Sequence, residues 1–390
     1  MRAMRSARTR VEGRCERNDR GAVPPTGAGR QARRRTSATS RPDRQERAIP
    51  PSFKHDITVI GGSAGAIGVL RELLASLPVD YPAAVFVVVH VAPDSPSVLA
   101  DILNRCSKLP VSFARTNAPI RPGTVVVAPP DRHLILEGER VVLSLGPREN
   151  GHRPSIDVMF RSAALAFGSR VTGVVLSGML DDGTAGLWTI KRRRGLAMVQ
   201  DPDEAEFPDM PRNAMDGVQV DQSLSVRDLG AALMRIATTP APPAVAPAPR
   251  DLVLEVNMAE KNNSEMAKLD EIGTRAPYSC PECGGALWEI EDGGPRFRCH
   301  VGHAYSARAL AAEQRTRVEA ALWAALRRLE ESERLAARMA QAARVRGNER
   351  SAQFHEDVSR GSAAHADTLR ELLTDPLASP SEPLDEAAGD

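Results

Sequence analysis

The stretch DITVIGGSAGA, residues 56–66, decides the fold of this chain of 390 residues. Its first half is a short β-branched run of the kind that forms a buried strand. The glycines after it permit a tight turn, and the apolar residues beyond the turn recur at helical spacing. These apolar residues are Ile67, Leu70, Leu73 and Leu74. The stretch therefore predicts a strand, a turn and a helix in direct succession.

Strand and helix signals continue to alternate as far as residue 237. Strand signals cover residues 84–89, 124–128 and 171–176, helix signals cover 97–104 and 186–191, and residues 133–145 alternate around Gly138 as a hairpin does. Such alternation predicts an α/β domain over residues 55–237, with a doubly wound, mainly parallel sheet covered by helices on both faces.

The composition is that of a globular protein, with 42% hydrophobic and 26% charged residues. No apolar run approaches the roughly 20 residues that span a bilayer. We therefore expect a cytoplasmic protein without membrane insertion. The net charge of +1 conceals a basic segment. Residues 1–47 hold 14 Arg and 5 acidic residues, a charge of +9, so the rest of the chain carries −8. An acidic body disfavours nucleic acid as the partner of the α/β domain.

Five segments flank the α/β domain. The expected segments are a disordered basic arm (1–54), a Pro/Ala-rich linker (238–276), a small Cys/His module (277–306), an α-helical hairpin (307–373) and a disordered acidic tail (374–390). The apolar stripes expected in the hairpin are Val318, Leu322, Ala325, Leu329, Ala336 and Met339, then Phe354, Val358, Leu369 and Leu372. Such stripes must pack against something, so we expect the hairpin to bind a partner or to self-associate.

The turn after the first strand fits the pattern G-x-S-x-G, with Ser63 at its centre. At a strand-to-helix turn, this pattern exposes a serine hydroxyl above the sheet edge, where it can act as a nucleophile. A glycine turn that binds an anion at the helix N-terminus is the alternative. The dinucleotide pattern G-x-G-x-x-G cannot be placed, because Ser63 and Ala64 follow the two glycines at the required spacing.

Two further side chains follow predicted strands. His90 ends the run 84–89 and is the candidate base, and Asp182 follows the run 171–176 and is the candidate that orients the base. His90 could instead bond a loop, and Asp181 and Asp182 could cap the next helix. Parallel strands place Ser63, His90 and Asp182 at one sheet edge, which favours a joint role. Their chain order differs from the Ser, Asp, His order of α/β-hydrolases.

Six motifs stand in order over about residues 56–237. They are VIGGSAGA (59–66), VVHVAPD (88–94), VAPPDRHL (127–134), RPSIDVMFRSAA (153–164), LSGMLDDGTAG (176–186) and QDPDEAEFPDMPRNA (200–214). Together they resemble the CheB-type protein-glutamate methylesterases of bacterial chemotaxis. The resemblance implies that Ser63 is the nucleophile, that His90 is the base and that Asp182 orients it. It also implies an oxyanion donor at the backbone N–H of Met179.

The implied reaction is hydrolysis of glutamate γ-methyl esters on the cytoplasmic helices of a chemoreceptor, with glutamine deamidation as a second activity. The implied setting is chemotaxis-like signal transduction with a phosphorelay. Typical family members carry an N-terminal receiver domain, and the first 54 residues are too short and too rich in Arg to form one. A non-enzymatic signalling scaffold that retains the methylesterase fold is the alternative.

The Cys/His module carries the spacing of a zinc site. Cys280 and Cys283 form C-x2-C, and after 15 residues Cys299 and His303 form C-x3-H. Thiolates and imidazole at such spacings suit tetrahedral Zn²⁺, and four protein ligands make the site structural. His300 is the alternative fourth ligand, and a hairpin of reduced thiols without metal is the alternative to a zinc site. No cofactor is expected for catalysis itself.

Overall fold

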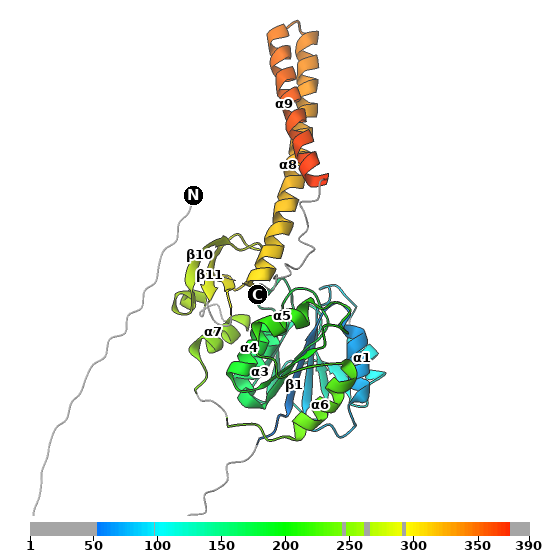
Figure 1. Ribbon diagram of the computed structural model, residues 1–390. Coiled ribbons are helices and arrows are strands. Elements are labelled where there is room, and N and C mark those ends of the chain that lie inside the picture. The colour runs from blue at the N-terminus through cyan, green and yellow to red at the C-terminus, as the bar shows by residue number, and fades with distance from the viewer. Residues whose placement is uncertain (1–52, 97, 244–246, 261–265, 291–293, 375–390) are drawn as a thin grey trace, which may run out of the picture. The chain divides into compact units, whose positions relative to one another are not determined.

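The computed structural model describes residues 53–96, 98–243, 247–260, 266–290 and 294–374. The predicted basic arm lies almost wholly outside these residues, and so does the predicted acidic tail. The described part of the chain contains a large parallel sheet, a small antiparallel sheet and a long helical hairpin (Figure 1).

The large sheet has seven strands in the order β3-β4-β2-β1-β7-β8-β9, and every neighbouring pair is parallel. The strands are β1 (Ile57–Gly62), β2 (Ala84–Val89), β3 (Val111–Phe113), β4 (Val125–Val127), β7 (Val171–Val175), β8 (Leu196–Gln200) and β9 (Gln222–Leu224). The central strands β1, β2 and β7 are buried along their whole length because helices cover both faces.

Helices form a layer on each face of this sheet (Figure 1). One layer holds α1 (Ala66–Ser76), α2 (Leu99–Asn104) and α6 (Val226–Thr238); the other holds α3 (Ile156–Phe167), α4 (Thr184–Arg192), α5 (Asp209–Gly217) and the hairpin of β5 (His133–Glu137) and β6 (Arg140–Ser144). Residues along β1 alternate between the layers, since Val59 packs under the second and Ile60 under the first. The predicted fold class is confirmed.

The direction of strand addition reverses at β1. From β1 the chain adds β2 on one side, and after β6 it returns to place β7 on the other side. In open α/β sheets the carboxyl edge at such a reversal is the usual place for a site. Ser63 follows β1, His90 follows β2 and Asp182 lies shortly after β7, so all three stand at this edge.

The segment expected to be a linker contains a packed helix, so that part of the prediction is wrong. Residues Arg250–Ala259 form α7, and Leu252, Leu254 and Met258 are buried along it. The prolines end at Pro249, where their fixed φ suits a helix start, and the apolar residues that follow recur at helical spacing. A short 3-10 turn, Met266–Glu271, leads from α7 to the Cys/His module.

The Cys/His module is a four-stranded antiparallel sheet that begins before the predicted boundary at residue 277. Its strands are β10 (Thr274–Ser279), β11 (Ala286–Ile290), β12 (Arg296–Cys299) and β13 (Ala304–Ser306), paired in chain order. Its apolar cluster is small: Ala276, Cys280, Leu287, Phe297, Cys299, Tyr305, Ala309 and Leu310. So few buried apolar groups provide little stability by themselves.

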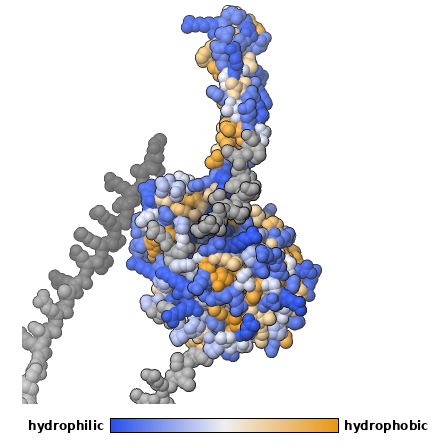
Figure 2. Space-filling model, viewed as in Figure 1, coloured by the Kyte–Doolittle hydropathy of each residue, from blue (hydrophilic) through white to orange (hydrophobic). Residues whose placement is uncertain are grey.

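The helical hairpin consists of α8 (Ala307–Val345) and α9 (Glu349–Thr374). Its seam differs in part from the predicted stripes, because most of its buried residues are alanines and several large apolar side chains are exposed. Ala336, Ala340, Ala343, Ala352 and Ala366 are buried, whereas Val318, Met339, Phe354, Val358 and Leu372 are exposed. Alanines let the two helices approach closely. Because large apolar side chains remain exposed, the space-filling view shows apolar patches among polar ones on the hairpin (Figure 2).

Candidate functional site

Ser63 lies at the junction between β1 and α1, in a turn that only small residues permit. Gly65 has φ 77°, and a side chain there would also meet the Ser177 hydroxyl. The Ser63 backbone N–H donates to the Ser177 carbonyl at 3.0 Å. Gly178 is close as well, since a Cβ on it would lie 2.8 Å from the Ser63 Cβ. The loop after β7 therefore packs directly against the serine.

His90 is held from one side by Asp182. The His90 Nε2 and the Asp182 Oδ2 lie 2.7 Å apart, and both side chains are almost fully buried. An ionised carboxylate accepts hydrogen bonds, so Nε2 carries the proton and Nδ1 has a free lone pair. Among the described residues, Nδ1 has no hydrogen-bond partner although it is buried. The imidazole is thus oriented at one nitrogen and available as a base at the other.

Asp182 accepts hydrogen bonds from three side chains and two backbone groups. The donors are His90 Nε2, Asn150 Nδ2, Ser155 Oγ and the backbone N–H groups of Ile156 and Asp157. Burial acts to raise the pKa of this carboxyl, but hydrogen bonding and attraction from His90, with the donors at the start of α3, hold the pKa below its ordinary value. Asp182 is therefore ionised.

The pKa of Asp157 is shifted in the opposite direction to the pKa of Asp182. It lies in the first turn of α3 and accepts from the backbone N–H groups of Gly183 and Gly186. Burial and the neighbouring charge of Asp182 raise the pKa of Asp157 well above its usual range. Two carboxyls share one buried region here, and the one that faces His90 keeps the negative charge.

His152 stacks on His90, with ring centroids 3.6 Å apart and planes inclined by 11°. It belongs to a tight turn, Glu149 to His152, whose ends exchange backbone hydrogen bonds of 3.2 and 2.9 Å. Burial and the adjacent His90 lower the pKa of His152 to about 4. A neutral ring therefore packs flat against the candidate base and limits its rotation.

We expect His152 to make stability depend on pH. Its pKa of about 4 in the folded chain lies below the ordinary value near 6.5, so between these values the unfolded chain binds more protons. The free energy of unfolding should therefore fall on acidification from pH 7 to pH 4.5, with about 2 kcal/mol of the decrease due to His152. Denaturant unfolding of the native chain and of His152→Gln at both pH values measures this, and an equal loss in both would contradict it.

Met179 lies in the loop that follows β7. Its side chain is exposed, and its backbone N–H makes none of the backbone hydrogen bonds found among the described loops and turns. The next residue, Leu180, has φ 61°, a left-handed conformation that a branched residue seldom adopts. The Asn213 side chain holds that conformation by donating to the Leu180 carbonyl at 2.7 Å. The loop is thus held beside Ser63, and within the described part of the chain the Met179 N–H has no backbone acceptor.

The structure brings Cys280, Cys283, Cys299 and His303 together, with all four candidate ligand atoms within 4.8 Å of one another. The Cys283 and Cys299 sulfurs lie 3.7 Å apart, and His303 Nδ1 lies 3.5 Å from the Cys299 sulfur. A tetrahedron with metal–sulfur bonds of about 2.3 Å has edges of about 3.8 Å, so the spacing fits Zn²⁺. His300 is outside this group of described residues.

A carboxylate supports the histidine of this cluster from its other side. Glu282 Oε2 lies 3.2 Å from His303 Nε2, which leaves Nδ1 directed at the sulfurs. Metal-binding histidines commonly have such a carboxylate on the second ring nitrogen, because it fixes the tautomer and the ring orientation. The donor set of this cluster, three thiols and one supported imidazole, therefore suits a structural metal.

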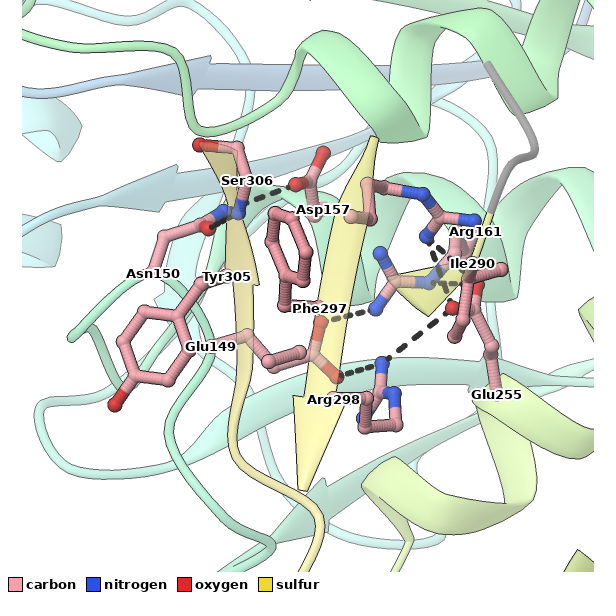
Figure 3. A pocket seen from close by; sticks show the side chains of 12 residues that line it. Glu149, Asn150, Asp157, Arg161, Glu255, Ile290, Phe297, Arg298, Tyr305 and Ser306 are labelled. Atoms are coloured by element: carbon pink, nitrogen blue, oxygen red, sulfur yellow. Dashed lines mark hydrogen bonds and ion pairs between the residues drawn. The ribbon is translucent and has the colours of Figure 1, made fainter. Parts of the chain in front are cut away.

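Buried charged side chains lie between the α/β domain and the Cys/His module (Figure 3). Glu149 pairs with Arg161 on α3 and with Arg298 on β12, and Glu255 on α7 pairs with Arg296. All of these except Arg296 are almost fully buried. None of these pairs was predicted from sequence, because the partners lie on different elements, from 12 to 149 residues apart in the chain.

Sequence reasoning also missed Asn150, His152, Ser155 and Asp157, which surround Asp182 and His90. A local signal existed for two of them, since Ser155 and Asp157 stand at the start of an apolar segment with helical spacing, where Ser and Asp favour a helix N-terminus. Asn150 and His152 lie in a loop without such a signal.

The parallel sheet and its two helical layers define a doubly wound α/β protein, with the candidate site at the point of strand reversal. Residues 58–233 match the family model described as CheB methylesterase. A relative in Leptospira interrogans is 36% identical over 185 residues, which are 47% of this chain and 96% of the relative. The chain belongs to the CheB methylesterase family.

Other relatives match over a smaller share of their own length. The protein-glutamate methylesterase/protein-glutamine glutaminase 2 of Anaeromyxobacter dehalogenans is 38% identical over 195 residues, which are 50% of this chain and 57% of that protein. Among solved structures, the Thermotoga maritima CheB methylesterase catalytic domain is 30% identical with a TM-score of 0.45, and the match covers 46% of this chain and 97% of that domain.

Proposed function

We propose that this chain is a protein-glutamate methylesterase with Ser63 as nucleophile, His90 as base and Asp182 as the residue that orients the base. The observation that carries the proposal is the 2.7 Å contact between His90 and Asp182 at the sheet edge where Ser63 stands. The proposed substrates are glutamate γ-methyl esters on chemoreceptor helices, in chemotaxis-like signal transduction. Membership of the CheB methylesterase family and the names of the relatives support this choice.

The reaction proceeds through an acyl-enzyme. The Ser63 Oγ attacks the ester carbonyl while His90 Nδ1 takes its proton, and Asp182 stabilises the imidazolium that forms. The backbone N–H of Met179 donates to the tetrahedral oxyanion, a contact typically worth about 3 kcal/mol in the transition state. Methanol leaves with the proton from His90. Water then attacks the acyl-enzyme by the same steps and releases glutamate.

Glutamine deamidation follows from the same chemistry. An amide carbonyl accepts the same attack by Ser63, and ammonia instead of methanol leaves with the proton from His90. The name of the Anaeromyxobacter relative includes a protein-glutamine glutaminase activity, which supports this second reaction.

Two assays on the native chain test the proposal together. A fluorophosphonate probe should label Ser63, identified by mass spectrometry of the labelled peptide, and the chain should release methanol from a chemoreceptor that a methyltransferase has methylated beforehand. Labelling without methanol release would point to a hydrolase for a different ester or amide. Failure of both assays in a folded chain would contradict an enzymatic function and favour the scaffold.

We also propose that Cys280, Cys283, Cys299 and His303 bind one structural Zn²⁺. Support comes from the spacing of their ligand atoms and from Glu282 behind His303. Bound there, the ion would neutralise thiolate charge and tie β10, β12 and the turn before β13 together. Four protein ligands fill a tetrahedral shell, so the ion would not bind substrate.

A further inference from the structure

The Cys/His module contacts residues that hold Asp182. We propose that the module positions this carboxylate through Asn150 and Ser306, so that residues outside the α/β domain contribute to the geometry of the site. The inference rests on the proposed function, since it concerns the side chain that orients His90. It predicts that loss of a contact between the module and the site lowers the rate of the reaction, which a module that only stabilises the fold would not do.

Asn150 is the central link, because its polar groups bond both to carboxylates of the α/β domain and to β13 of the Cys/His module. Its Nδ2 donates to Asp182 Oδ1 at 2.9 Å and to Asp157 Oδ2 at 3.1 Å. Its Oδ1 accepts from the Ser306 backbone N–H at 2.8 Å, and its own backbone N–H donates to the Ala304 carbonyl at 2.7 Å. The amide therefore cannot turn away from Asp182 without losing its contacts with β13.

The backbone at Asn150 also depends on its neighbours. Asn150 has φ 51°, a left-handed conformation that asparagine tolerates better than most residues but that still costs free energy. Residues 149 and 304 form a parallel bridge, so β13 lies along the turn and holds this conformation. The same turn carries His152, which stacks on His90. Contact with β13 thus helps to fix the positions of both Asp182 and His90.

Glu149 anchors the turn to the module. Its carboxylate pairs with Arg161 from α3 and, at 2.9 Å, with Arg298 from β12 (Figure 3). The three side chains are at most 2% exposed. An ion pair without access to water is costly to separate, because each charge would remain buried without its partner. The module is therefore fixed to the turn by a contact that is not easily broken.

Ser306 makes the second connection. Its hydroxyl donates to Asp181 Oδ1 at 2.6 Å and accepts from the Ala309 backbone N–H at 3.0 Å, so it also caps α8. Asp181 adjoins Asp182 in the loop after β7. The contact therefore fixes the loop from the module side, one residue away from the carboxylate that orients the base.

The test compares two serines that each cap a helix. Ser306→Ala removes the cap of α8 and the contact with Asp181, whereas Ser225→Ala removes the cap of α6, where the hydroxyl bonds to Asp228 and to neither Asp181 nor Asp182. Both variants should lose similar thermal stability. We expect Ser306→Ala alone to lower kcat for methyl ester hydrolysis, by about tenfold with KM unchanged, because misplaced groups reduce rate more than binding. Ser306→Thr, which retains a hydroxyl, should restore kcat.

The rate of Ser63 labelling by a fluorophosphonate probe provides a readout that needs no receptor. It should fall in Ser306→Ala and stay at the native value in Ser225→Ala. Equal kcat and equal labelling rates in the two alanine variants would overturn the connection that the Ser306 hydroxyl makes to Asp181, while leaving the proposed function intact. A native chain that neither labels nor releases methanol would instead overturn the proposed function.

Discussion

Replacement of Ser63 by alanine is expected to lower kcat for methyl ester hydrolysis by a factor of about 10⁴ or more. The reason is that the acyl-enzyme needs an oxygen at this position, and the alanine leaves only the oxyanion donor and substrate binding to assist attack by water. Methanol release from a methylated receptor, followed by gas chromatography, measures the loss. Fluorophosphonate labelling should disappear in the same variant.

Ser76→Ala is the matched control for this experiment. Ser76 ends the same helix that begins beside Ser63, and within the described part of the chain its hydroxyl bonds only to the Leu73 carbonyl, at 2.7 Å. Its loss should leave kcat at the native value. If Ser63→Ala released methanol at the native rate, Ser63 would not be the nucleophile, and a water activated by His90 would have to replace it.

Replacement of Cys299 by serine is expected to abolish zinc binding and to unfold the Cys/His module. The native chain should contain about one zinc per chain by elemental mass spectrometry, and the variant close to none. Structural zinc sites in small domains have apparent binding free energies of roughly 10 to 16 kcal/mol, far more than an apolar cluster of this size provides. Limited proteolysis should therefore cleave the variant within residues 274–306.

Cys106→Ser is the control, because Cys106 is a free cysteine just after α2 whose sulfur bonds to the carbonyls of Ile102 and Leu103. This variant should keep its zinc and its resistance to protease. A native chain that contains no metal and nevertheless resists proteolysis in the module would contradict the zinc proposal, since the β-strands would then be stable without it.

The parts of the fold that sequence reasoning could predict are those with local signals. The run from Asp56 to Gly65 predicts strand and turn from adjacent residues, and the alternation around Gly138 predicts the β5–β6 hairpin in the same way. The placement of Ser63, His90 and Asp182 at one sheet edge was also predictable, because it follows from strand polarity alone.

Other features depend on residues that meet only in the folded chain. Arg298 lies in a strand whose alternation gives no sign that its charge is buried, and its partner Glu149 is 149 residues away. Glu255 lies on α7, a helix that was not predicted, so its ion pair with Arg296 could not be predicted either. The hairpin seam was missed for another reason: helix packing selected small residues such as Ala340 over larger apolar ones such as Met339.

The contact between Asn150 and Ser306 also sets an order of assembly during synthesis. The two residues are 156 positions apart, and at about 5 to 20 residues per second the ribosome needs roughly 8 to 30 seconds to add that length. During this time the α/β domain can fold on the emerging chain while the turn at Asn150 has no β13 beside it. Under the proposed function and the proposed role of the module, a nascent chain would carry an incomplete site, and full hydrolytic activity would begin only when the Cys/His module has been translated and has folded.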